Sequence, residues 1–137
     1  MPIKATTKRA GFTLIELLIV MAILALLAGI IGPSLWNKLG GAKHDVALTQ
    51  IKNIEVALDS YRLDMGRYPK NLDEMVKNNS GKARWDGPYM KNIPLDPWGK
   101  AYEYQLSGDH NGREYTLLSL GADGQEGGEG EDKDIHH

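Results

Sequence analysis

The chain has 137 residues, of which 42% are hydrophobic and 25% are charged, a composition typical of a single domain unless one segment holds the apolar residues. It has no cysteine, which excludes disulfide bonds, zinc–thiolate sites and cysteine nucleophiles. The net charge is −2, and basic residues without any acid mark the N-terminus (Lys4, Lys8 and Arg9), so the rest of the chain is acidic and lacks the basic surface of a nucleic-acid-binding protein.

One segment does hold the apolar residues. Residues 17–37 contain no charged side chain, and a helix of these 21 residues would cross the roughly 30 Å hydrocarbon core of a bilayer. The run is longer than the apolar region of a secretory signal peptide, and no A-x-A-like cleavage site follows it. Because basic residues precede it, we expect a single-pass membrane protein whose C-terminal part lies outside the cytoplasm.

A single carboxylate, Glu16, lies at the start of this apolar segment. With Thr13 it has the T-x-x-E pattern of a capping box, and a carboxylate also suits the positive end of a helix. An ionised carboxylate within a membrane, however, costs a few kcal/mol unless it is paired, which favours a functional role. Further along, Gly29, Gly32 and Pro33 weaken the helix and predict either a tolerated kink or a stretch that unwinds when subunits pack.

A second helical pattern follows residues 40 and 41. Apolar residues recur there at spacings of three and four, which predicts one buried helix face made of Ala47, Ile51, Ile54, Leu58 and Tyr61. Val56 lies opposite this face, and we interpret it as an ordinary exposed residue, with a subunit contact as the alternative. The helix should end near Gly66 and Pro69.

The remainder predicts short elements. Residues 71–78 should form a short helix with Asn71 and Glu74 in capping-box positions. Residues 87–102 should form a loop held by three apolar anchors (Tyr89, Ile93 and Trp98). Two strand-like runs, 101–106 and 114–120, flank a turn rich in Gly, Asp and Asn and predict a hairpin. The expected fold class is α+β, a long helix packed on a small antiparallel sheet.

The C-terminal segment is acidic and glycine-rich. Six acids lie within twelve positions: Asp123, Glu126, Glu129, Glu131, Asp132 and Asp134. Calcium requires six to eight oxygen ligands from carboxylates and carbonyls on a loop able to wrap around it. On composition alone, a solvated disordered tail is the better interpretation.

The stretch KRAGFTLIELLIVMAIL resembles the N-terminal signature of type IV pilins and of type II secretion pseudopilins. The landmarks RYP, PYMKNIPLDPWG and SLGADG are similar to those of the major, G-type pseudopilins, so the resemblance spans nearly the whole chain. The absence of cysteine favours a pseudopilin, because type IV pilins usually close their C-terminal region with a disulfide.

This resemblance implies a type IV pilin-like fold and cleavage by a prepilin peptidase between Gly11 and Phe12. Residues 1–11 would then be the leader, 12–37 the transmembrane and assembly helix, and 38–137 the periplasmic domain. Phe12 would become a methylated N-terminus. Glu16 would meet the N-terminus of a neighbouring subunit during filament assembly.

For the acidic tail, the resemblance favours calcium binding over a disordered tail, because G-type pseudopilins bind calcium in the loop after SLGADG. It implies four ligands, with Asp132 as a plausible fifth: the Leu120 and Gln125 carbonyls and the Asp123 and Asp134 carboxylates.

The expected function is structural: a subunit of the periplasmic pseudopilus of a type II secretion system, supporting export of folded proteins across the outer membrane. Expected partners are copies of itself, the prepilin peptidase, other pseudopilins, inner-membrane assembly components and the outer-membrane secretin channel, but no nucleic acid. The chain would lie in the inner membrane with its C-terminal domain in the periplasm. The alternative is a type IV pilin for adhesion, motility or DNA uptake. An enzyme is not expected, because no P-loop, G-x-G-x-x-G or Ser-His-Asp pattern is recognisable.

Overall fold

The computed structural model describes Met1, residues 11–110 and residues 113–137, while the side chains of 108–110 and 113 fall outside that description. Most of the expected leader, with its three basic residues, therefore lies outside the described residues. The chain forms two compact units, Met1–Lys38 and Leu39–His137.

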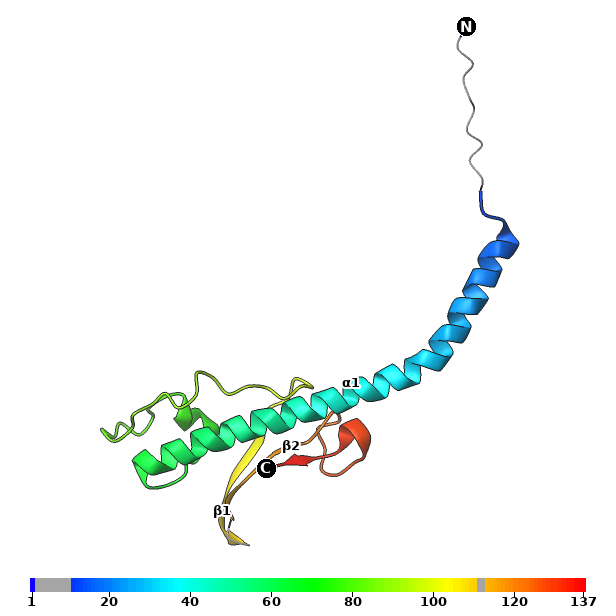
Figure 1. The fold of residues 1–137 in the computed structure, drawn as a ribbon. Coiled ribbons are helices and arrows are strands. Elements are labelled where there is room, and N and C mark those ends of the chain that lie inside the picture. The colour runs from blue at the N-terminus through cyan, green and yellow to red at the C-terminus, as the bar shows by residue number, and fades with distance from the viewer. Residues whose placement is uncertain (2–10, 111–112) are drawn as a thin grey trace. The chain divides into compact units, whose positions relative to one another are not determined.

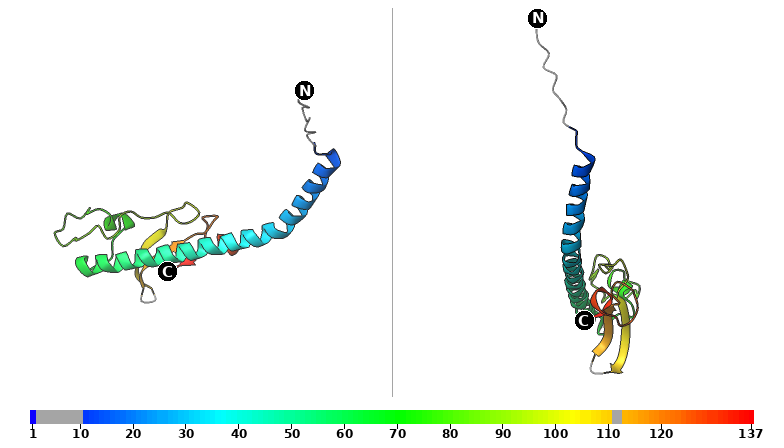
Figure 2. Two further views of the ribbon diagram at one scale, coloured as in Figure 1. Left: turned by 45° about the horizontal axis from the view of Figure 1, so that its top comes forward. Right: turned by 90° about the vertical axis from the view of Figure 1, so that its right-hand side faces the viewer.

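The dominant element is helix α1, Leu14–Met65, a continuous helix of 52 residues (Figures 1 and 2). It passes through Pro33 without a break, so the stretch that was expected to kink or unwind is helical here. Unwinding when subunits pack stays a prediction. The helix ends as expected, because Gly66 adopts a left-handed conformation (φ 73°) and its N–H donates to the Arg62 carbonyl at 2.8 Å.

In the second unit, a three-stranded antiparallel sheet with the order β1-β2-β3 accompanies the helix. The expected hairpin is present as β1, Glu103–His110, and β2, Arg113–Ser119, so the first strand starts and ends later than expected. The third strand, β3, Ile135–His136, was not expected. It pairs with the end of β2, where Ile135 faces Ser119, and returns the acidic tail to the sheet.

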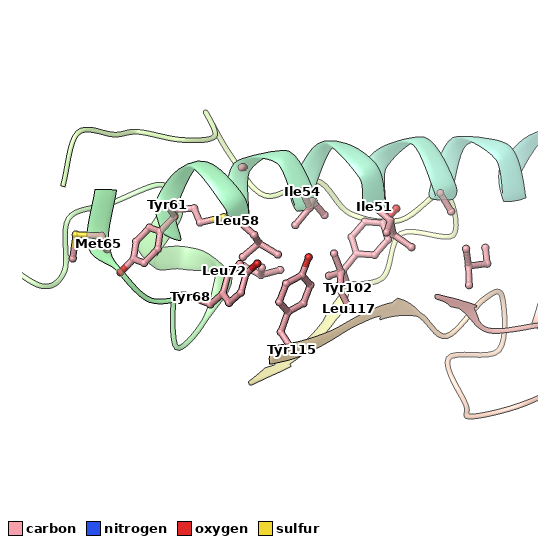
Figure 3. Close-up of a cluster of buried hydrophobic side chains, with 14 residues drawn as sticks. Ile51, Ile54, Leu58, Tyr61, Met65, Tyr68, Leu72, Tyr102, Tyr115 and Leu117 are labelled. Carbon is pink, nitrogen blue, oxygen red and sulfur yellow. The ribbon is translucent and has the colours of Figure 1, made fainter. Parts of the chain in front are cut away.

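The core of this unit lies between the buried face of α1 and the sheet (Figure 3). All five residues of the predicted helix face are buried, each at most 1% exposed (Ala47, Ile51, Ile54, Leu58 and Tyr61). Tyr115 and Leu117 of β2 point toward them. Val56, on the opposite side, is exposed as expected. The three loop anchors are half-buried against the core.

A buried polar network joins α1 to the short helix η1, Leu72–Met75. Asn71 caps η1 as expected, since its side chain accepts from the Glu74 N–H at 3.3 Å. The Glu74 carboxylate has another role: it accepts from the Tyr61 hydroxyl at 2.7 Å and from Arg67 at 3.3 Å. Burial, reinforced by this carboxylate, raises the pKa of Tyr61 to about 12, so the hydroxyl stays a donor.

Candidate functional site

The first candidate site is the start of α1, within the unit Met1–Lys38. The helix contains a window long and apolar enough to cross a membrane by length and composition, and no residue of that window is buried. Phe12, Leu14 and Ile15 are exposed at 87%, 81% and 65%. Apolar surface of this extent is expected to be covered by lipid or by protein.

Glu16 forms a complete capping box with Thr13. Its Oε2 accepts from the Thr13 backbone N–H at 2.8 Å and from the Thr13 hydroxyl at 3.0 Å, while the Glu16 N–H donates to that hydroxyl at 3.3 Å. The structural role considered for Glu16 is therefore present. The same carboxylate is exposed, which leaves it accessible to a further cationic partner.

The peptide bond between Gly11 and Phe12 lies just before the helix, in backbone without regular secondary structure. Both residues are exposed, and nothing lies within 4 Å of the position that a Cβ at Gly11 would take. This segment can therefore be reached by an enzyme, whereas a bond within the helix could not be cleaved without unwinding.

The second candidate site is the acidic loop between β2 and β3. Asp123 Oδ1 accepts from the Gln125 N–H at 3.1 Å, which folds the start of the loop into a turn. Asp134 lies at the far end, where its Oδ2 accepts from the Gly127 N–H at 2.9 Å. The loop is thus an ordered structure and not the disordered tail that composition alone suggested.

One atom of this loop fits a cation. Asp134 Oδ1 is buried and has no hydrogen-bond partner in the described part of the chain. A buried carboxylate oxygen without a partner is unfavourable, and a hard cation is a suitable partner for it. Side chains alone do not complete a site: within the described residues, no three His, Asp or Glu side chains are grouped closely enough to hold a metal. The ligand set that the resemblance implies also includes two backbone carbonyls, those of Leu120 and Gln125.

The tail is held against α1 by a close contact at Gly40. This glycine is buried, and the Glu131 side chain lies 2.9 Å from the position that a Cβ would take there. Glu131 belongs to the short helix η2, Gly130–Asp132, which also contains the expected ligand Asp132. Asp132 is exposed. A side chain at position 40 would require the Glu131 side chain to shift.

Sequence reasoning missed the turn that supports this loop from the other side. Asp96 is only 4% exposed, and its Oδ1 accepts from the N–H groups of Trp98 at 3.1 Å and Lys100 at 2.8 Å. Its Oδ2 accepts from the Ser119 hydroxyl at 2.7 Å. The only available signal was the Asp-Pro-Trp-Gly sequence, which is typical of a turn.

Comparisons with known families match both parts of the chain. The family model described as type II secretion system (T2SS), protein G, matches residues 34–137. The prokaryotic N-terminal methylation motif matches residues 6–32, which include Gly11, Phe12 and Glu16.

Individual relatives agree with the family models. The type II secretion system core protein G of Pseudomonas aeruginosa is 42% identical over 136 residues, covering 93% of this chain and 94% of that protein. The core protein G of Vibrio cholerae is 40% identical, covering 96% and 93% of the two chains. A crystal structure of the major pseudopilin from the type 2 secretion system of enterohaemorrhagic Escherichia coli matches with a TM-score of 0.60 and 29% identity, covering 77% of this chain and 94% of that one.

Proposed function

Since the chain belongs to the type II secretion system protein G family, we propose that it is a structural subunit that polymerises into a periplasmic pseudopilus and supports export of folded proteins across the outer membrane. The relatives carry the name of a secretion component, which favours this function over a type IV pilin for adhesion, motility or DNA uptake. The family is one of structural subunits and not of enzymes.

The observation that supports polymerisation most directly is the uncovered apolar surface of residues 14–37, which contains the exposed carboxylate of Glu16 near its start. Before assembly, the bilayer of the inner membrane covers this surface, with residues 38–137 in the periplasm. In the filament, the same surface packs against copies of itself. One apolar segment thus serves as both membrane anchor and assembly surface.

Cleavage after Gly11 by a prepilin peptidase would create a positively charged amino group on Phe12. Glu16 of a neighbouring subunit is the natural partner for it, because each charge is costly alone in an apolar environment. The Thr13 backbone N–H keeps the carboxylate oriented at the helix start until that partner arrives. Other pseudopilins, the inner-membrane assembly components and the secretin channel complete the set of proposed partners.

Mass spectrometry on purified filaments tests this function. The chain is produced together with a prepilin peptidase and the inner-membrane assembly components, and fibres are collected from the periplasmic fraction after the outer membrane has been disrupted. We expect fibres whose subunits begin at a methylated Phe12 and lack residues 1–11. Fibres built from subunits that retain residues 1–11 would contradict the pairing mechanism, and the absence of any fibre would contradict the function.

Calcium binding by the acidic loop is the second part of the proposal. The ligands would be the Leu120 and Gln125 carbonyls and the Asp123 and Asp134 carboxylates, with Asp132 as a fifth protein ligand and water completing the shell. The Oδ1 of Asp134, which is buried and has no hydrogen-bond partner among the described residues, supports this assignment. The cation would neutralise the acids and join the two ends of the loop, a stabilising role that a disulfide fills in other folds.

Thermal unfolding of the full chain in detergent micelles tests the calcium site. A chelator should lower the Tm, because a ligand that binds only the folded state stabilises it. The variant D134N should show a smaller chelator effect, whereas E126Q, which removes an exposed acid outside the ligand set, should respond like the native chain. If the chelator leaves the native Tm unchanged, calcium has no part in this fold.

A further inference from the structure

The turn 96–100 contacts the acidic loop by two independent routes. The turn is closed by its own hydrogen bonds: the Asp96 N–H donates to the Lys100 carbonyl at 2.7 Å, and the Gly99 N–H donates to the Asp96 carbonyl at 2.9 Å. With the two bonds to Asp96 Oδ1, four hydrogen bonds within five residues fix its shape. It is therefore rigid without help from the loop.

The first route runs through a buried serine. Ser119 at the end of β2 is fully buried, donates its hydroxyl to Asp96 Oδ2 at 2.7 Å and accepts from the Gly121 N–H at 3.2 Å. Gly121 has a φ of +70°, and a Cβ there would lie 2.7 Å from the Glu131 carbonyl oxygen. Asp96 thereby fixes the residue where the chain leaves the sheet and enters the loop.

The second route runs through the Lys100 side chain. Its Nζ donates to the Ala122 carbonyl. Its Cδ, Cε and Nζ lie 3.1 Å from the position that a Cβ at Gly124 would take, and Gly124 has a φ of +67°. The Lys100 side chain therefore packs closely against Gly124, which is in a left-handed conformation. On the other side, the Ala122 N–H donates to the Glu131 carbonyl at 2.8 Å.

These contacts surround residues 120–125, which include three of the proposed calcium ligands, Leu120, Asp123 and Gln125. Neither Asp96 nor Lys100 belongs to the ligand set. We propose that the turn 96–100 is a positioning element that holds residues 120–125 in their cation-binding conformation before any cation arrives. This inference rests on the calcium site proposed above, and it adds that the loop is preformed by Asp96, Ser119 and Lys100.

A preformed loop avoids the cost of ordering upon binding. If only a fraction of molecules has the loop in its competent form, the apparent affinity falls by that fraction. Removing a contact from the turn should therefore make the calcium-free loop more mobile and its calcium binding weaker. A residue that only stabilised the whole domain would instead affect all regions alike.

Hydrogen exchange of the full chain in detergent micelles, with a calcium chelator present, tests the proposal. We expect S119A, which removes two side-chain hydrogen bonds, and K100M, which removes one, each to accelerate amide exchange in residues 120–125 by at least about three- to tenfold, while residues 51–61 of α1 keep their protection. The matched controls are S107A, a serine of the same sheet that contacts Thr116, and K91M, an exposed lysine. Both controls should exchange like the native chain in residues 120–125.

Calcium titration by calorimetry supplies the second measurement, with calcium chloride as the probe. S119A changes no charge and should raise the Kd for calcium by about three- to tenfold if the loop must then be ordered on binding. K100M is less suitable for this titration, because loss of the positive charge of Lys100 would by itself raise the affinity of the loop for a cation.

The two proposals fail in distinguishable ways. If S119A and K100M leave exchange in residues 120–125 unchanged, or if exchange increases equally in residues 51–61, the positioning role is wrong. An unchanged calcium Kd in S119A would likewise overturn it. If the variants loosen the loop but the native chain binds no calcium, the turn organises the loop and the calcium site is wrong.

Discussion

The two parts of helix α1 place their apolar residues differently. Residues 14–38 present them around the whole helix, and none of these residues is buried. Residues 47–61 concentrate them on one face, which is closed by the protein's own sheet. Helical conformation alone therefore does not determine what covers a helix. The distribution of apolar residues does, because a helix that is apolar all round needs lipid or other subunits, whereas an apolar stripe needs only one partner layer.

The largest expected effect concerns the charge at the start of the exposed part. E16A should abolish filaments while membrane insertion continues, because the buried amino group of the next subunit loses its partner. T13A is the matched control, since it removes the capping hydroxyl and keeps the carboxylate. Electron microscopy of cells producing each variant measures the outcome. If T13A also prevents filaments, the role of Glu16 is to cap the helix; if E16A assembles normally, the pairing is wrong.

A pair of leucine substitutions tests the difference between the two parts directly. L58A truncates a side chain that is fully buried. It should lower the free energy of unfolding by about 2 to 5 kcal/mol, because it removes apolar contact and leaves a cavity. L24A truncates an exposed side chain of the same helix and should change that free energy by less than about 0.5 kcal/mol.

Denaturant unfolding in detergent micelles measures both variants. Filament assembly should show the opposite ranking. L24A should impair packing between subunits more than a substitution within residues 47–61 that leaves the domain stably folded. Equal losses of unfolding free energy for L58A and L24A would show that the two parts share one core, and would remove the distinction drawn here.

The smallest expected effect is a pH dependence in the covered part. Burial acts to raise the pKa of Glu74, but the Tyr61 hydroxyl and the charge of Arg67 outweigh it and lower the pKa below its ordinary value of 4.5. The ionised form therefore stabilises the fold above about pH 4.5, and this contribution is lost as the pH falls through the lowered pKa.

Thermal unfolding between about pH 6 and pH 3 measures this contribution. The native Tm should fall more steeply on the acid side than that of E74Q, which cannot ionise. E126Q, an exposed acid in the tail, is the control for general acid effects. Parallel curves for the native chain and E74Q would show that the Tyr61 and Arg67 contacts do not depend on the charge.

Much of the fold could be predicted because its signals are local. The three-and-four spacing from Ala47 to Tyr61 gave the buried helix face, and Gly66 gave its end. The third strand was missed because two residues cannot show an alternating pattern, and their pairing depends on a tail that returns from far along the chain. Glu74 illustrates the same limit: its spacing from Asn71 indicated a cap, but its carboxylate is directed to Tyr61 by tertiary contacts.

The two candidate sites also differ in how far local sequence could predict them. Gly11, Phe12 and Glu16 lie within one short motif, so their roles could be proposed from the resemblance of that motif to the pilin signature. The loop required knowledge of which oxygens approach one another, which the sequence from Leu120 to Asp134 does not contain. The support from Asp96 was not anticipated at all, because nothing in a turn sequence indicates that its acid will be buried against Ser119.

Strand β3 has a consequence for the order of folding. Ile135 is 2% exposed, and the His137 N–H donates to the Leu117 carbonyl at 3.1 Å, so residues 135–137 help to complete the core and the sheet. The core is therefore complete only once β3 has paired with β2. Because contacts between segments distant in sequence are slow to form, closure of the core is expected to be a late step in folding.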